Sequence, residues 1–294
     1  MKKRGFTLIE LLTVLSIVAV ALALAIPGVT RATQDARQTH CKNNLKMLGL
    51  ALHNYHDTYV SFPPGWVSRS GEPGLGGRIG WQSSILPYVD QAPLYNQIDF
   101  RATSPIEADG KPNPLFQTPI KDYRCTQDTT PNLNTLRGEF ATSSYSGNYG
   151  PDPAPRLRGL RMSDSWPGAV ESPSESRGIF ARNSSMRLAK IVDGSSNTIM
   201  VGERGATSGS GIWAGVTDNG HEDDAVTDTS HRSRINTGSN SFSSRHQNMP
   251  GANFLLCDGS VRFVSAEINS QPGPEMGLFQ RIGCINDGFE VGEF

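Results

Sequence analysis

The sequence predicts an α+β chain in which a long N-terminal helix packs on an antiparallel β-sheet that carries long loops. Three observations lead to this fold class. Residues 6–26 form one apolar run, residues 41–59 carry apolar side chains at helical spacing, and two short β-type segments flank Asp258-Gly259. The 31 glycines and 19 prolines among 294 residues indicate a loop-rich globular part.

The apolar run is long enough to cross a membrane. As a helix it extends roughly 30 Å at about 1.5 Å per residue, which matches the hydrocarbon core of a bilayer. Lys2, Lys3 and Arg4 precede it, and the positive-inside rule places that end in the cytoplasm. We therefore expect a transmembrane helix over 6–26 and an extracytoplasmic domain over 27–294. A cleaved secretory signal is the alternative, but the run is long and the helical pattern continues beyond it.

Glu10 is the one charged residue inside the apolar run. A carboxylate within a membrane helix costs about 2.5–3.5 kcal/mol on insertion scales, and such residues are usually functional. The alternative is that Glu10 lies near the membrane surface and reaches the headgroups. Its position five residues after Gly5 favours the functional interpretation.

The helix is expected to continue outside the membrane as an amphipathic segment. Pro27-Gly28 should end or kink the apolar part near the membrane face. Beyond it, apolar residues recur every three or four positions, which predicts a helix of about eight turns with one face toward a core. Phe62-Pro63-Pro64-Gly65 should end this helix. The apolar positions are Cys41, Leu45, Leu48, Leu52, Tyr55 and Tyr59.

The rest of the chain alternates short elements with loops. Residues 81–98 predict one or two short helices split by Pro87 and Pro93, with their aromatic side chains in the core. Residues 150–177 and 205–245 are rich in glycine and serine and predict exposed loops.

Strand signals come late in the sequence. We expect a strand over 198–201, and a hairpin over 253–264 that turns at Asp258-Gly259. An Asp-Gly pair between β-type segments is typical of a two-residue type I′ turn.

Four cysteines, none in a C-x-x-C pair, exclude zinc-ribbon and thioredoxin-like motifs. An even number in an exported domain permits two disulfides in three possible connectivities, and buried free thiols are the alternative. We expect at least one bridge, with Cys41–Cys125 as the candidate pair. The other cysteines are Cys257 and Cys284.

The sequence contains no common hydrolase, nucleotide-binding or metalloprotease motif, so we expect no enzyme and no cofactor. The net charge of −1 gives no sign of a nucleic-acid partner. His246 and Asp258 could form a catalytic pair, but packing at a strand entry and forming a turn are simpler roles.

One acidic loop could bind calcium through oxygen ligands, although it lacks the spacing of an EF-hand. A solvated loop without metal is the alternative. Its carboxylates belong to Asp218, Glu222, Asp223 and Asp224.

Residues 2–10, KKRGFTLIE, resemble the cleavage and methylation motif of type IV prepilins and type II secretion pseudopilins. The resemblance implies that residues 1–5 are a leader and that a prepilin peptidase cuts between Gly5 and Phe6 and N-methylates Phe6. It also implies a role for Glu10 in assembly, as partner of the Phe6 ammonium of a neighbouring subunit. Neither charge is stable alone in lipid, so their pairing would fix the register of the helices.

Further segments extend the resemblance along the chain. CKNNLK at 41–46, LHNYHD at 52–57, FPPG at 62–65 and DGSSNTI at 193–199 are similar to a large bacterial family. That family pairs a prepilin N-terminus with a domain of unknown function and a C-terminal H-x(9)-DG motif. Here His246 and Asp258-Gly259 carry that motif, with eleven residues between the histidine and the aspartate. The resemblance implies a pilin-like fold and an envelope location rather than a chemistry.

Together these features predict a prepilin-like, membrane-anchored subunit of a pilus, a pseudopilus or a type II secretion-like filament. Its expected partners are the prepilin peptidase, other pilin-like subunits, the inner-membrane assembly machinery and the membrane itself. It should cross the bacterial inner membrane once, with a cytoplasmic N-terminus, and reach the cell surface on assembly. The alternative is a membrane-anchored surface binding protein that is processed but does not polymerise. Glu10 favours the filament, because a plain anchor gains nothing from an intramembrane carboxylate.

Overall fold

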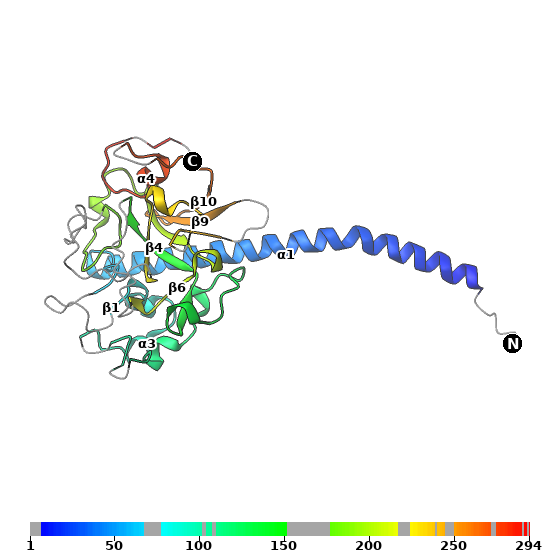
Figure 1. Ribbon diagram of the computed structural model, residues 1–294, viewed down its shortest axis with the longest axis horizontal. Helices are drawn as coiled ribbons and strands as arrows, with labels where there is room; N and C mark the ends of the chain where they lie inside the picture. Colours follow the sequence, from blue (N-terminus) through cyan, green and yellow to red (C-terminus); the bar gives the residue numbers. More distant parts are fainter. Residues whose placement is uncertain are drawn as a thin grey trace.

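The structure is a long helix, α1 (Leu8–Tyr59), whose C-terminal half is embedded in a globular domain (Figure 1). The α+β fold class is confirmed. This computed structural model describes residues 7–67, 78–101, 104–107, 110–151, 177–216, 224–238, 240–244, 250–271, 275–289, 291–292 and 294.

Both ends of α1 have recognisable caps. Thr7 precedes the helix and forms a capping box with Glu10, in which each residue bonds the backbone N–H of the other. At the other end Val60 adopts a left-handed conformation with φ of 56°, and its N–H donates to the carbonyl of His56 at 2.7 Å. A residue in that conformation ends a helix because it turns the chain away from the helix axis.

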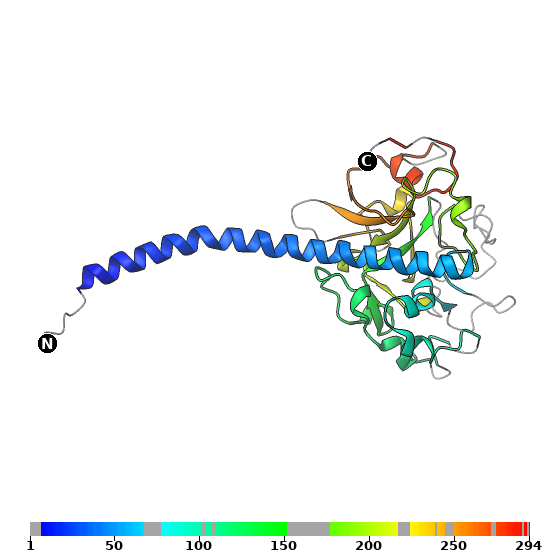
Figure 2. The ribbon, with the colours of Figure 1, turned by 180° about the vertical axis from the view of Figure 1, so that it is seen from behind.

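Pro27-Gly28 was predicted to end or kink the apolar helix, and the first of these alternatives is wrong, because α1 runs through both residues. A proline removes one backbone donor, and the turns on either side still hold their own hydrogen bonds. The hydroxyl of Thr30 also donates to the carbonyl of Ile26 at 2.9 Å. Figures 1 and 2 show a gentle curve along the outer half of α1 rather than a break.

The inner half of α1 packs as the periodicity predicts. It runs along the domain between the side that carries β9 and β10 and the side that carries α3 (Figure 2). The stripe holds until the last turn, where Tyr55 is partly buried and Tyr59 is 54% exposed. The fully buried members of the stripe are Cys41, Leu45, Leu48 and Leu52.

The largest sheet has five strands in the order β10-β9-β5-β4-β8. It is mixed rather than purely antiparallel, because β8 pairs in parallel with β4 while the other pairings are antiparallel. The strands are β4 (Tyr145–Gly150), β5 (Ile199–Glu203), β8 (Val226–Asp228), β9 (Gly251–Leu256) and β10 (Val261–Ser265).

Two smaller sheets and several short helices complete the described part of the domain. One sheet has the order β2-β3-β6, and the other pairs β1 with β7. Their strands are β1 (Arg78–Ile79), β2 (Leu133–Asn134), β3 (Phe140–Ser143), β6 (Gly211–Ile212) and β7 (Gly215–Val216). The short α-helices are α2 (Trp81–Ser84), α3 (Ala92–Tyr95) and α4 (Leu278–Ile282). The 3₁₀ helices are η1 (Leu86–Tyr88), η2 (Pro114–Gln117), η3 (Lys121–Tyr123), η4 (Thr135–Arg137), η5 (Leu188–Lys190), η6 (Ala206–Ser208) and η8 (His231–Ser233).

Residues 81–98, predicted as one or two short helices, contain three short helical elements, α2, η1 and α3. Pro87 and Pro93 are the second residues of η1 and α3, so each proline lies in the first turn of an element as well as dividing the segment. Trp81 in α2 is fully buried and stacks on Phe180, with ring centroids 4.9 Å apart. The aromatic residues here therefore include core residues, as predicted.

The prediction that residues 205–245 form exposed loops is wrong for the part that the structure describes. β6, β7 and β8 lie in this stretch, and Trp213 and Phe242 are fully buried. Several of the serines that suggested a loop are buried with hydrogen-bond partners, as Ser208 is with the Ser241 hydroxyl at 3.2 Å. A polar composition does not separate a solvated loop from a core in which hydroxyls are paired. Most of the other predicted loop, 152–176, lies outside the described residues.

β9 and β10 form the predicted hairpin, but the turn is not type I′. Leu256 and Ser260 close a three-residue loop through an N–H to carbonyl bond of 2.8 Å. Gly259 has φ of +84°, whereas Asp258 is not among the residues with positive φ. A type I′ turn needs positive φ at both central residues, and a three-residue loop needs it only at the glycine.

Candidate functional site

The outer half of α1 projects away from the domain (Figures 1 and 2). Every described side chain from Leu8 to Thr33 is exposed, and most of those up to Val29 are apolar. Within the described residues, α1 is the one helix long and apolar enough to cross a membrane. Soluble monomers rarely expose an apolar surface of this size, so this surface is suited to lipid or to other helices.

Glu10 lies at the start of this projecting half, in the first turn of α1. Its Oε2 accepts the hydroxyl of Thr7 at 2.6 Å and the backbone N–H of Thr7 at 2.9 Å. In return, the Glu10 N–H contacts the Thr7 hydroxyl oxygen at 3.4 Å. Glu10 is thus a helix cap as well as a charge in the apolar run. The sequence signal for this cap is T-x-x-E at 7–10, which is the capping-box spacing and was not among the features that predicted a role for Glu10.

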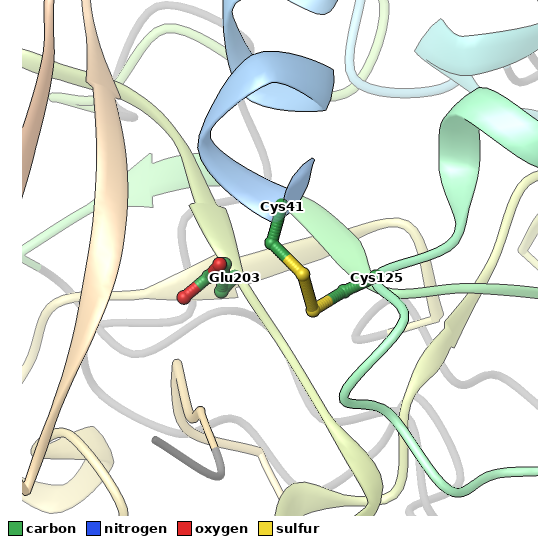
Figure 3. Close-up of side chains that lie close together, drawn as sticks. All are labelled: Cys41, Cys125 and Glu203. Carbon is green, nitrogen blue, oxygen red and sulfur yellow. A yellow bond between two sulfur atoms is a disulfide. The ribbon is translucent and has the colours of Figure 1, made fainter. Parts of the chain in front are cut away.

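A disulfide lies where α1 enters the domain (Figure 3). It joins Cys41 to Cys125, the candidate pair named from the sequence, across 84 positions and with the Cα atoms 4.9 Å apart. Among the α1 side chains that the structure describes, Cys41 is the first that is buried. Two hydrogen bonds support the junction: Tyr145 donates to the Cys41 carbonyl at 3.1 Å, and the Asn44 amide donates to the Arg124 carbonyl at 2.8 Å.

Glu203 at the end of β5 lies beside this bridge (Figure 3). One of its carboxylate oxygens and the two sulfur atoms lie within 4.8 Å of one another. Asn253 on β9 donates to the carboxylate from its backbone N–H at 2.8 Å and from its amide at 3.0 Å. Two cysteines and a carboxylate could hold a metal ion, but thiolates are the ligands, and here both sulfurs are in a disulfide.

A second cluster of metal-ligand type contains Asp193, Cys284 and Asp287, whose ligand atoms lie within 4.8 Å of one another. The Asp193 carboxylate accepts the backbone N–H groups of Asp287 and Gly288 at 2.6 and 3.0 Å, so it already holds a turn. Burial raises the pKa of the Cys284 thiol, which keeps its proton and makes it a poor ligand. The arrangement is accounted for by local structure.

The remaining candidates from the sequence divide into two groups. Asp258 is exposed in the β9–β10 loop and accepts the Ser260 N–H at 2.8 Å, which is a turn role. Asp224 is buried and forms an ion pair with Arg137, so its charge is already compensated. The other candidates lie outside the described residues: Gly5, Phe6, Asp218, Glu222, Asp223 and His246.

The two remaining cysteines, Cys257 and Cys284, are buried and free. Burial raises the pKa of both thiols, well above the ordinary value for Cys257. Buried thiols of this kind are chemically inert. The structure therefore contains one of the two disulfides that the cysteine count permits.

Comparison with known proteins adds two family matches. Residues 30–271 match the family described as "Protein of unknown function (DUF1559)". Residues 1–26 match the "Prokaryotic N-terminal methylation motif". The two matches meet near the middle of the projecting half of α1.

Two curated proteins are also similar to the chain. It is 34% identical over 87 residues to the type IV major pilin protein PilA of Myxococcus xanthus, an alignment that covers 28% of this chain and 38% of that protein. It is 32% identical over 59 residues to the competence protein ComGC of Halalkalibacterium halodurans, covering 20% and 58%. The chain thus spans less than two thirds of either relative. No solved structure matches it.

Proposed function

Because the chain belongs to the DUF1559 family and begins with a prokaryotic N-terminal methylation motif, we propose that it is a prepilin-like subunit of an envelope filament. This filament would be a pilus, a pseudopilus or a type II secretion-like assembly. The observation that carries the proposal is the projecting half of α1, an exposed apolar helix with one carboxylate in its first turn. The similarity to a type IV major pilin supports it.

The proposed topology follows from the basic N-terminus and the apolar run. Residues 1–5 would be a leader, removed by a prepilin peptidase that cuts between Gly5 and Phe6 and methylates Phe6. Residues 6–26 would cross the bacterial inner membrane, with residues 27–294 on the extracytoplasmic side. The further partners would be other pilin-like subunits and the inner-membrane assembly machinery. The role is structural, and we propose no catalytic activity and no cofactor for it.

We propose that Glu10 has one partner before assembly, Thr7 of its own chain, and another after assembly, the Phe6 ammonium of a neighbouring subunit. Within its own chain, the Thr7 N–H and hydroxyl satisfy one oxygen of the carboxylate. This local cap lowers the cost of carrying Glu10 through lipid before assembly. Cleavage after Gly5 would create an ammonium group at Phe6, and the corresponding group of a neighbouring subunit would then be a stronger partner for Glu10. Pairing of opposite charges in lipid would fix the position of each incoming helix.

Three variants separate a role of Glu10 in assembly from its role in capping. Glu10→Leu and Glu10→Gln remove the charge, whereas Thr7→Ala removes the capping hydroxyl and keeps the carboxylate. For each variant one measures membrane content, precursor cleavage and the yield of filaments or crosslinked oligomers. We expect the Glu10 variants to be inserted and cleaved but to assemble poorly, whereas Thr7→Ala should assemble.

Two outcomes would contradict the proposal. Glu10→Leu that assembles as well as wild type would remove the main physical support for a filament subunit, and an anchored binding protein would be the better account. If Thr7→Ala fails in assembly as severely as Glu10→Leu, Glu10 acts chiefly as a cap of its own helix.

A further inference from the structure

The two cysteines of the Cys41–Cys125 bridge differ in exposure. Cys41 is fully buried on α1, whereas Cys125 is 8% exposed. Cys125 also lines a small hollow together with Asp128, Ser144 and Glu203. The hollow borders the bridge on the side of Cys125, and Cys41 does not line it.

The carboxylate of Glu203 places a charged group beside the bridge. It is 2% exposed and accepts three hydrogen bonds from two nitrogens of Asn253, the backbone N–H and the side-chain amide. A carboxylate only accepts hydrogen bonds, so this set of donors suits it. When an external thiol opens the bridge, its thiolate attacks one sulfur, and the other cysteine leaves as a thiolate. A negative charge within 4.8 Å of both sulfurs opposes both events.

We propose that Cys125 is the sulfur at which a small external thiol exchanges with the bridge, and that Glu203 slows this exchange. In the step, the external thiolate forms a bond to the Cys125 sulfur and the bond between Cys125 and Cys41 breaks. Cys41 leaves as a thiolate and takes a proton from water. The products are a mixed disulfide on Cys125 and a free Cys41 thiol, so atoms and electrons balance.

The position of the bridge gives this exchange a consequence for α1. Cys41 is the first buried residue among those described in α1, and the burial of Leu45, Leu48 and Leu52 holds the helix beyond that point. A pull on the projecting half first meets the hydrogen bond from Gln127 to the Gln34 carbonyl at 3.4 Å, and the bridge is the first covalent connection that it reaches. A slow exchange keeps this covalent connection closed, and an opened bridge leaves the helix held by side-chain packing and hydrogen bonds.

The position of the adduct tests the proposal on the wild-type chain. The full-length protein in detergent micelles is incubated with reduced glutathione, free thiols are then alkylated, and the modified peptides are identified by mass spectrometry. We expect glutathione on Cys125 and the alkyl group on Cys41. Glutathione mainly on Cys41, or equally on both, would overturn the assignment of Cys125.

The role of Glu203 is tested by a matched pair of variants. Glu203→Gln removes the buried charge at nearly constant shape and should raise the exchange rate about tenfold or more. Glu107→Gln neutralises an exposed carboxylate on a residue whose carbonyl accepts the Gly110 N–H, and it should leave the rate unchanged. Equal rates for Glu203→Gln and wild type would overturn the role of Glu203.

A comparison of thiols keeps this role testable if Glu203→Gln does not fold. On the wild-type chain, cysteamine, which carries an ammonium group, is compared with mercaptoethanesulfonate, which carries a sulfonate. The ratio of their rates should be several-fold higher than their ratio on a neutral small-molecule disulfide. Equal ratios would show that no negative charge acts at the bridge. None of these measurements depends on filament assembly, so their results do not depend on whether the proposed function is correct.

Discussion

Cys41 and Cys125 illustrate what single residues contribute to the stability of this domain. Their bridge closes a long loop between α1 and the segment that follows η3. Closing such a loop removes many conformations from the unfolded chain, and the stabilisation grows slowly with loop length. The bridge is therefore expected to stabilise the domain against unfolding even though α1 is also held by packing.

Replacing both cysteines by serine should lower the free energy of unfolding by roughly 3–5 kcal/mol, because the loop spans 84 positions. Denaturant unfolding of the purified protein in detergent measures this difference. Wild-type protein whose bridge has been reduced is the matched control and should resemble the double variant. A double variant as stable as oxidised wild type would contradict a structural role for the bridge.

Asp287 shows how a single carboxylate makes stability depend on pH. Burial raises its pKa, the N–H of Phe289 lowers it, and the neighbouring Asp193 carboxylate raises it again, with a net increase above 3.8. A raised pKa means that the folded chain holds this proton more tightly than the unfolded chain. The contribution of Asp287 to stability is therefore present below pH 3.8 and is lost as the pH rises through the folded value.

Asp287→Asn should consequently raise the midpoint of thermal unfolding at pH 7 relative to wild type. The amide oxygen can still accept the Phe289 N–H, as the carboxylate does now at 2.8 Å. The difference should shrink as the pH falls and should vanish below about pH 3.8, where wild type is also neutral. Unfolding curves of both proteins between pH 3 and pH 8 provide the comparison, and a variant less stable than wild type at pH 7 would refute it.

At the scale of elements, the sequence predicted the buried face of α1 but neither its course through Pro27 nor the type of the β9–β10 turn. Apolar spacing located the buried stripe because a helix brings every third or fourth residue to one face. At Pro27 the helix does not end, because the hydrogen bonds of a long helix outweigh one missing donor. At Asp258-Gly259 the residue pair predicted a turn, but its type depends on the register between β9 and β10, which the sequence alone does not give.

Two leucines of α1 allow a matched test of this docking. Leu48 is fully buried, whereas Leu50 is 63% exposed on the same helix. Leu48→Ala should lower the free energy of unfolding by about 2–5 kcal/mol, since it removes buried methyl groups and leaves a cavity. Leu50→Ala should change it by less than about 0.5 kcal/mol. Similar losses for both variants would mean that the helix is not docked on the face described.

At the scale of the whole molecule, the sequence predicted the division into a projecting helix and an α+β domain, but little of the domain's interior. Apolar periodicity is local and visible, whereas the packing of small polar residues depends on partners far along the chain. Ser210, for example, is buried because Asp128 and Thr130 satisfy its hydroxyl at 2.8 and 2.7 Å. The closeness of Glu203 to the bridge likewise arises because β5 and the two cysteines meet only in the folded chain.

The N-terminal motif could be predicted from the sequence, whereas the pairing of the cysteines could not be derived from it. The spacing between Gly5 and Glu10 is written in the sequence, and so is the run of apolar residues that follows. The pairing of Cys41 with Cys125 was one of several possibilities, because cysteine spacing alone does not determine connectivity. The cap between Thr7 and Glu10 was visible as a pattern, and it matters because it gives the carboxylate a partner within its own chain.

The central claim is that this chain is processed as a prepilin and then acts as a membrane-anchored subunit. The most direct test is the N-terminus of the mature protein, isolated from native envelopes and analysed by intact mass and N-terminal sequencing. The account predicts a chain that lacks residues 1–5 and begins at Phe6 with one methyl group on its amine. A chain that retains Met1, or one that begins beyond Ile26, would contradict it.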